Sequence, residues 1–338
     1  MKKSIFIAVI FAWGVFFPGA AYASKGILYR EANLIGGYSD REGWIGKREG
    51  ALKNSLGFEY YKKFANEYGD FLTADLQVRL TYDSIMNADE AWGIDIHNAW
   101  LEYKAGLGKQ IIFGHFDVPF GLEPLLDTHG TLFQTLAMKN LGFKNDWGIG
   151  YKGLVGDYDY TIAAQLGSGM SVRSRDGSHL LSGRIGSSRD REFQYGLSLA
   201  YGRVLHSMED RTYPLPALMS DEAVLKKRVG LDAQYLAGPF DFKGEIAYGQ
   251  NNDEDVVGVL PQIEYAVPRN QNLKFILQGN YWANDLSDRG RDDVTLGIGA
   301  SYKLSASTDV RLGYFHDLQN SMGEEDKQIL LQFYYFGK

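Results

Sequence analysis

The strongest constraint on the fold of this chain is a two-residue alternation that recurs along it. In ADLQVRLTYD (residues 74–83), apolar and polar side chains alternate without interruption. Successive side chains of a strand point to opposite faces, so such a segment has one apolar face and one polar face. Similar alternation occurs in residues 193–201, 228–235, 240–248 and 294–304. Because lipid offers no partner to an unpaired backbone group, a sheet of such strands can cross a membrane only as a closed barrel.

The first residues have the features of a secretory signal peptide. Two lysines and an apolar run (residues 5–17) precede small residues at Ala21 and Ala23. The run is shorter than the roughly 20 residues that a membrane-spanning helix needs, which argues against an anchor. We therefore expect residues 1–23 to be a signal peptide, and residues 24–338 to form one β-barrel domain in the bacterial outer membrane.

Composition agrees with a large antiparallel sheet. The chain has 22 Tyr, 19 Phe and 40 Gly but only 8 Pro, a mixture typical of strands joined by turns. The absence of cysteine excludes disulfides and thiolate metal sites. A formal net charge of -7 argues against a nucleic-acid partner.

The alternation predicts sixteen strands of an all-β, transmembrane antiparallel barrel. Their expected ranges are 30–38, 54–66, 70–84, 95–106, 109–116, 145–153, 158–167, 179–189, 192–204, 226–238, 240–251, 256–267, 273–284, 293–305, 308–318 and 327–336. Short connections follow the even-numbered strands and longer, more acidic ones follow the odd-numbered strands. Short turns belong to the periplasmic side of such barrels and long loops to the outside, so both termini are expected in the periplasm.

Tyrosines recur near the ends of the apolar faces, as Tyr82, Tyr201 and Tyr302 illustrate. At a membrane interface the aromatic ring can sit in hydrocarbon while the hydroxyl reaches the headgroups. We interpret these tyrosines as interfacial girdles; the alternative is that they simply pair across strands.

One connection is longer than the others. DVPFGLEPLLDTHGTLFQTLAMKNLGFK (residues 117–144) contains apolar residues that would be costly to expose as a group. It is expected either to fold inward against the barrel wall or to pack on a neighbouring subunit, with a short helix in TLFQTLAMK. If it folds inward, its charged residues are candidates for the pore constriction. These candidates are Asp117, Glu123, Asp127, His129, Lys139 and Lys144.

A resemblance to a known family is carried by this region. FGHFDVPFGLEP (residues 113–124), the long loop and NDWGIGYKG (residues 145–153) resemble the corresponding region of the phosphate-selective porin O/P-like family. The resemblance implies a sixteen-stranded outer-membrane channel, typically trimeric, whose third outer loop folds into the pore. Members often have lysine at the position of Asp117, which argues against a strong anion preference here. The chain also continues with Gly337 and Lys338 after its last aromatic residue, whereas barrels commonly end on an aromatic one.

The charges expected on the lumen face are nearly balanced. By strand parity, nine basic residues point inward: Arg79, Lys104, Lys152, Arg184, Arg228, Lys243, Lys274, Lys303 and Arg311. Eight acidic residues do the same: Asp75, Asp83, Glu102, Asp159, Asp232, Asp241, Glu245 and Glu264. Acidic runs at 253–255 and 324–326 are expected in outer loops, where they would favour cations or neutral solutes.

These features predict a porin, a water-filled diffusion channel for small hydrophilic solutes or ions with weak charge selectivity. The alternative is a barrel that sheathes a partner such as an outer-membrane electron-transfer cytochrome. No enzymatic activity or cofactor is expected, because the six histidines are scattered and no nucleophile, base and orienting group can be grouped. The expected partners are the solutes, outer-membrane lipid and further copies of the chain in a homotrimer.

Overall fold

The chain folds into one sheet of long antiparallel strands. A computed structural model describes residues 22–23, 26–48, 52–87, 90–126, 128, 130–188, 190–288, 290, 292–320 and 324–338. The sixteen long strands are β2 (Ile27–Ser39), β5 (Leu52–Asn66), β6 (Gly69–Tyr82), β7 (Trp92–Gly106), β8 (Lys109–Asp117), β9 (Asn145–Val155), β10 (Tyr158–Gln165), β11 (His179–Ser187), β12 (Phe193–Val204), β13 (Val224–Ala237), β14 (Phe240–Asn251), β15 (Glu254–Ala266), β16 (Leu273–Ala283), β17 (Asp292–Ser305), β18 (Thr308–Gln319) and β19 (Asp326–Gly337). The short elements are β1 (Tyr22–Ala23), β3 (Gly43–Ile45), β4 (Lys47–Arg48), the 3-10 turn η2 (Glu123–Leu125) and the helix α2 (Ala137–Asn140). Neither helical element is long enough to cross a membrane.

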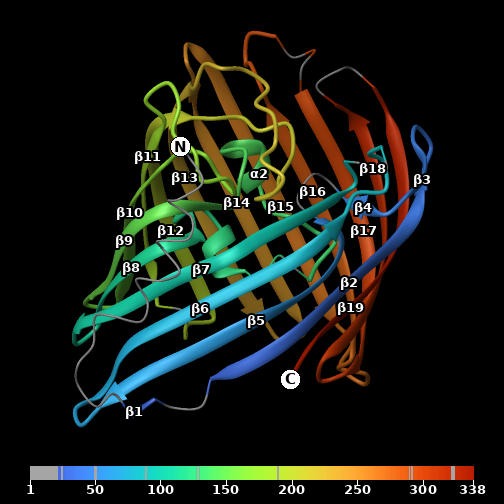
Figure 1. Cartoon of the computed structure of the whole chain (residues 1–338). Helices are drawn as coiled ribbons and strands as arrows, with labels where there is room; N and C mark the ends of the chain where they lie inside the picture. Colours follow the sequence, from blue (N-terminus) through green and yellow to red (C-terminus); the bar gives the residue numbers. More distant parts are fainter. Residues whose placement is uncertain are drawn as a thin grey trace.

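The long strands close into a barrel. Each pairs with its sequence neighbour, and β19 returns to pair antiparallel with β2, from Gln328↔Ser39 to Gly337↔Arg30. Figure 1 shows the strands tilted around a common interior. Closure leaves the sixteen long strands without a free edge, as a lipid environment requires. The predicted sixteen-stranded antiparallel barrel is confirmed, and the predicted strand limits lie within three residues of the observed ones.

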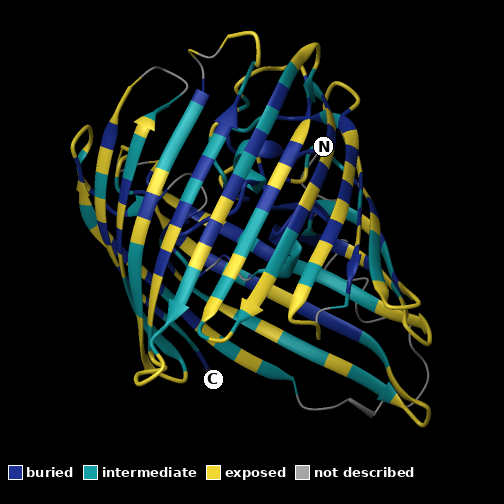
Figure 2. Ribbon diagram, turned by 180° about the vertical axis from the view of Figure 1, so that it is seen from behind, coloured by how far each residue is buried: buried dark blue, intermediate teal, exposed yellow. Residues whose placement is uncertain are grey.

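The burial pattern is the reverse of that in a water-soluble sheet. On β6, the apolar Leu76 and Leu80 are 37% and 47% exposed, whereas Arg79 is only 8% exposed. Figure 2 shows the same alternation of buried and exposed residues along strands around the barrel. An apolar exterior and a polar interior are the arrangement that lipid outside and water inside demand. The protein is therefore an outer-membrane β-barrel.

The connections distinguish the two ends of the barrel. Turns of two residues join β5 to β6, β7 to β8, β9 to β10, β13 to β14 and β17 to β18 at one end. The opposite end, called the outer end below, carries the long connections at 83–91, 118–144, 166–178 and 205–223.

One expected acidic outer loop is shorter than predicted. The strands β14 and β15 are joined by a two-residue turn, residues 252–253, so Glu254 and Asp255 belong to β15. Asn252 has a φ of 52°, a conformation that asparagine tolerates in tight turns. The turn signal of the asparagine therefore prevails over the run of charges.

Aromatic residues on the outward face cluster near the two-residue turns. Phe193 and Tyr235 have ring centroids 6.1 Å apart, and Phe240 and Tyr265 are 5.0 Å apart. The first three of these side chains are 40–51% exposed on the outer wall. The rings thus pair across strands and also lie where an interfacial girdle is expected.

The assignment of strand faces predicts how the cost of an added charge depends on its depth in the membrane. Leu76 is in the middle of β6, so Leu76→Arg is expected to lower the free energy of unfolding by about 2–4 kcal/mol. Leu80 is close to the outer end, so Leu80→Arg is expected to cost nearer 0–1 kcal/mol. Gln77 gives the inward control, because its side chain borders a lumen cavity and donates to Glu31 at 2.9 Å; Gln77→Arg keeps a donor beside this carboxylate and is expected to cost less than Leu76→Arg. Urea titration of the barrel refolded in lipid would measure the three values, and equal costs at Leu76 and Gln77 would reject the faces.

Candidate pore constriction

The connection between β8 and β9 folds into the barrel. Its base is closed by a hydrogen bond from the Val118 N–H to the Lys144 carbonyl, 2.9 Å long. Between these residues the chain descends into the interior, where η2 and α2 lie in Figure 1. We call residues 118–144 the inward loop.

Apolar contacts hold the inward loop against the barrel wall in two places. Leu122 and Leu136, fully buried, belong to a cluster with Leu260 and Trp282 of the wall. Leu125 and Leu126 are partly buried against this cluster.

A second cluster joins Leu132 and Phe133 to Ile276, Phe315 and Leu330 of other strands. Phe133 and Phe315 have ring centroids 5.1 Å apart. Because the inward faces of β16, β18 and β19 carry apolar residues at these points, the loop covers apolar wall that would otherwise face water.

The entry of the inward loop is fixed by a carboxylate of the wall. Gly121 donates its N–H to the Ser198 hydroxyl at 3.0 Å, and Leu122 donates to Glu245 Oε2 at 3.2 Å. Gly121 has a φ of +63°, and a Cβ atom at this position would collide with the Glu245 carboxylate. Glycine is therefore required both by the backbone conformation and by the close approach.

The exit of the inward loop is fixed by two cations of β13. Lys226 Nζ donates to the carbonyls of Asn140 and Leu141 at 3.1 and 3.0 Å, and Arg228 Nε donates to Asn140 Oδ1 at 2.7 Å. These bonds satisfy carbonyls at the end of α2 that have no helical partner. The charge of Lys226, burial and Arg228 together lower the pKa of the nearby His206 to about 3, so that this imidazole is neutral at pH 7.

A buried polar network stiffens the inward loop from within. Lys144 Nζ lies 3.4 Å from Glu123 Oε1, and Glu123 also accepts hydrogen bonds from the hydroxyls of Thr128 and Thr135. Lys144 further donates to Gln134. Glu123 and Lys144 are 5% and 7% exposed, so these two constriction candidates are directed to the loop's own interior.

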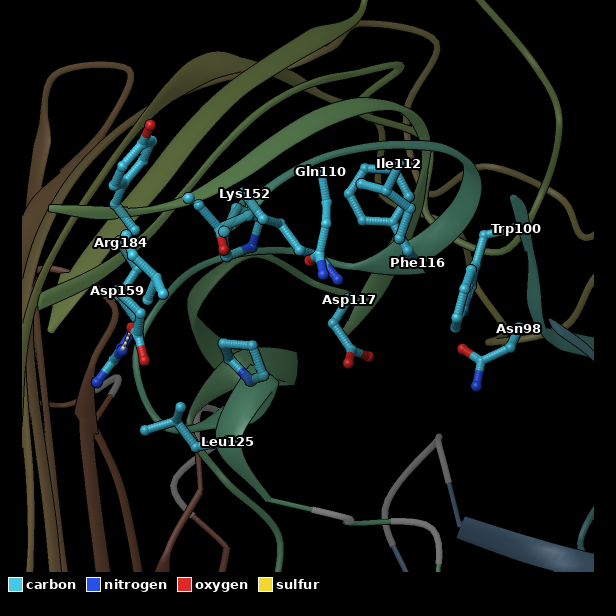
Figure 3. Close-up of a pocket in the computed structure, with 17 residues that line it drawn as sticks. Asn98, Trp100, Gln110, Ile112, Phe116, Asp117, Leu125, Lys152, Asp159 and Arg184 are labelled. Atoms are coloured by element: carbon cyan, nitrogen blue, oxygen red, sulfur yellow. Dashed lines mark ion pairs between the residues drawn. The ribbon is translucent and has the colours of Figure 1, made fainter. Parts of the chain in front are cut away.

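Asp117 borders two neighbouring cavities of the lumen. The first cavity has a volume of about 420 Å³, and Figure 3 shows the Asp117 carboxylate directed into it. Lys152 and Gln110 lie on one side of Asp117, and Trp100 and Asn98 lie on the other. A second cavity of about 280 Å³ lies between the inward loop and β5–β7, and it shares Asp117 and Asn98 with the first. The two cavities thus meet at Asp117.

The other candidates of the loop are placed differently. Lys139 Nζ pairs with Asp293 of β17 at 3.1 Å, so this charge is anchored to the wall. Asp127 and His129 lie outside the described residues. Of the six candidates, Asp117 and Glu123 border these cavities within the described structure, and the Glu123 carboxylate is held by Thr128, Thr135 and Lys144.

Most of the expected lumen charges are arranged in pairs on the inward faces of the strands. Arg184 contacts Asp232 at 2.6 Å and Asp159 at 3.7 Å, and Lys152 contacts Glu102 at 3.0 Å. The remaining pairs are Arg79 with Glu31 (2.9 Å), Lys104 with Asp70 (3.9 Å), Lys243 with Asp241 (3.0 Å) and Glu264, Lys274 with Glu264 (3.7 Å) and Arg311 with Asp309 (3.0 Å). Asp75 is buried on the inward face of β6, while Arg228 and Glu245 hold the inward loop.

The inward loop separates two electrostatically different regions. The cavity of about 280 Å³ on its β5–β7 side is bordered by the carboxylates Glu59 and Asp117 and by the loop residue Glu123, and the described residues add no lysine or arginine to its lining. A cavity of about 260 Å³ on the other side is bordered by Lys243, Lys274 and Arg311, with Glu264 as its carboxylate. Sequence parity predicted the four charges of this second cavity as lumen charges, but it did not predict Glu59 and could not assign any charge to a side of the loop.

Two functional elements escaped the sequence analysis. Lys226 was not among the expected lumen charges, although it is inward-facing and two residues from Arg228. Trp100 borders the cavity of about 420 Å³ and packs against Ile112 and Phe116. The i, i+2 spacing of Lys226 and Arg228 on one strand was the available signal for a joint role.

Comparison by sequence finds no matching protein family and no matching curated protein. Comparison of structures finds outer-membrane porins. An anion-selective porin from Comamonas acidovorans aligns with a TM-score of 0.65 and 12% identity, covering 92% of this chain and 99% of that one. OmpF of Salmonella typhi in complex with daunomycin gives 0.65 and 14%, covering 92% and 97%. The outer-membrane channel DcaP of Acinetobacter baumannii gives 0.58 and 13%, with the same coverage. These likenesses span nearly the whole barrel, and the narrower resemblance to the phosphate-selective porin O/P-like family stays an expectation. The chain has the fold of an outer-membrane porin.

Proposed function

We propose that the protein is a porin, a water-filled diffusion channel that passes small hydrophilic solutes or ions and has weak charge selectivity. The observation that carries this proposal is the inward loop, which is fixed at both ends by Glu245, Lys226 and Arg228 and leaves cavities of about 420 and 280 Å³ beside it. Cavities of this size suit small solutes. The inward loop then sets the narrowest part of the pore, with Asp117 at the water path.

The pairing of charges supports weak selectivity with a lean towards cations. At the cavity of about 420 Å³, Lys152 and Arg184 each contact a carboxylate. Paired bases attract anions weakly, because the neighbouring carboxylate cancels much of their field. The carboxylates of Glu59 and Asp117 on the β5–β7 side favour cations.

Reversal potentials under a potassium chloride gradient test the proposal. The wild-type channel in a planar bilayer is expected to give small reversal potentials that lean towards potassium. Asp117→Lys is expected to shift them towards chloride, because the charge changes at the point where the two cavities meet. The matched control is Asp221→Lys, the same change on an exposed side chain of the outer loop 205–223, and its effect is expected to be much smaller. A strong chloride preference of the wild type would contradict the proposal.

The alternative role, a sheath for an electron-transfer cytochrome, is less well supported. The inward loop occupies the interior, and the cavities beside it are far smaller than a protein domain. We also propose a homotrimer as the assembly in the membrane. The support is the porin fold, together with a similar structure of an outer-membrane protein, OmpT of Vibrio cholerae, described as a trimer form and covered over 99% of its length.

A further inference from the structure

The outer wall of the barrel has a broad, open hollow over β9–β14. Its volume is about 1040 Å³, and it is lined mainly by apolar side chains of the outward face. Gly183 of β11 lies in register with Ile162 of β10 and Leu199 of β12. Both of these neighbours are more than half exposed, at 55% and 59%. A glycine between large outward side chains leaves a gap in the wall, and this gap forms the hollow.

A lysine stands at the outer rim of this hollow. Lys227 of β13 lines it and pairs in register with Tyr201 and with Gln250, which is two residues from the turn at the outer end. Lys227 Nζ donates to Gln250 Oε1 at 3.1 Å. The side chain therefore lies on the lipid-facing wall, near the level of the outer headgroups.

The surroundings of Lys227 differ from those of other outward cations at this end. Arg203 pairs with Asp176 at 2.5 Å, and Lys327 pairs with Glu325 at 3.0 Å. Within the described part of the chain, no carboxylate lies within 4 Å of Lys227 Nζ, although its partner Gln250 donates through Nε2 to Asp255 at 3.0 Å. A cation on the lipid face that is not paired directly with a carboxylate can receive an anionic group from the membrane.

We propose that this face binds a phosphorylated lipid of the outer leaflet, with its phosphate on Lys227 and an acyl chain in the hollow at Gly183. The charge of the headgroup complements the lysine, and the chain fills a gap that is lined by Ile162, Leu181, Ile185, Leu197, Leu199 and Val229. The rim tyrosines, Tyr160, Tyr201 and Tyr248, present amphipathic rings to the lipid. This lipid site is independent of conduction through the lumen.

Native mass spectrometry of the detergent-purified protein with added diphosphorylated lipid A tests the proposal. The wild type is expected to retain one lipid per chain, and to retain the dephosphorylated lipid at least tenfold more weakly. Lys227→Met is expected to lose the preference for the phosphorylated lipid. Gly183→Leu, whose Cβ would meet Ile162 Cγ2 at 3.2 Å and the Thr161 carbonyl oxygen at 3.3 Å, is expected to weaken retention of both lipids by filling the hollow.

Two matched controls separate this site from the rest of the wall. Lys327→Met removes an outward lysine at the same end. Gly36→Leu adds a side chain at an outward glycine where nothing lies within 4 Å of a Cβ atom. Both are expected to retain lipid as the wild type does. Heat-modifiable migration on gels shows that each variant is folded.

Equal retention by Lys227→Met and the wild type would overturn the proposal. It would also be overturned if Lys227→Met and Gly183→Leu left lipid retention intact and dissociated an oligomer, since the hollow would then seat a second copy of the chain. Inorganic phosphate alone is expected not to compete, because it lacks the acyl chain.

Discussion

Deleting residues 124–138 is expected to raise the single-channel conductance severalfold while the barrel stays folded. The deleted segment contains the apolar residues that lie across the interior, including Leu132, Phe133 and Leu136. The hydrogen bond between Val118 and Lys144 closes the base of the inward loop and lies outside the deletion. Contacts to Glu245 at the entry and to Lys226 at the exit also lie outside it. The shortened loop therefore keeps both of its anchors, and the lumen loses its obstruction together with the apolar cover of Ile276, Phe315 and Leu330.

Planar-bilayer recordings of the deletion variant and the wild type measure the effect. Lys139→Met is a suitable control, because it removes the pair with Asp293 and leaves the loop in place, so the conductance is expected to stay near the wild-type value. Heat-modifiable migration on gels reports the state of the barrel. If the deletion left conductance unchanged and a trimer dissociated instead, the inward loop would be an interface element and not the constriction.

The strands could be predicted from sequence because their signal is local. In β6 each side chain faces lipid or lumen according to parity alone, so ADLQVRLTYD is sufficient to define both faces. The connection at Asn252 was predicted two residues too long, because the prediction counted the acidic residues Glu254 and Asp255 as loop.

The fixing of the inward loop could not be predicted in the same way. Gly121 is held by Ser198 and Leu122 by Glu245, at separations of 77 and 123 residues, and Asn140 is held by Arg228 at a separation of 88. Parity identified Glu245 and Arg228 as inward charges, but only closure of the barrel brings them to the loop. For the same reason Glu123 and Lys144, read as water-facing, are partners in a buried pair: ionic groups leave water only when they find each other.

A substitution at Gly121 measures how much the anchor at the entry of the inward loop contributes to stability. Gly121→Ala is expected to lower the free energy of unfolding by about 2–5 kcal/mol, of which about 1–2 kcal/mol is the strain of a left-handed conformation and about 1–3 kcal/mol is the loss of the buried hydrogen bond between Leu122 and Glu245. Gly238→Ala is the matched control. Gly238 has a φ of +59°, close to the +63° of Gly121, but nothing lies within 4 Å of a Cβ atom there. This variant is expected to show the strain alone.

A double-mutant cycle with Glu245→Ala isolates the collision from the strain. Removing the carboxylate makes room for the Cβ atom, so Gly121→Ala is expected to cost only about 1–2 kcal/mol in that background. Urea unfolding of the barrel in lipid gives the four free energies, and single-channel noise reports whether the entry of the loop has become mobile. Additive costs in the two backgrounds would show that Gly121 and Glu245 act independently, and the anchor at the entry of the inward loop would then be wrong. The expected result is that Gly121→Ala costs less free energy of unfolding in the Glu245→Ala background, and that both single variants show greater current noise. A steady open-channel current would then depend on the buried Glu245 carboxylate and on the glycine that lets this carboxylate approach the backbone.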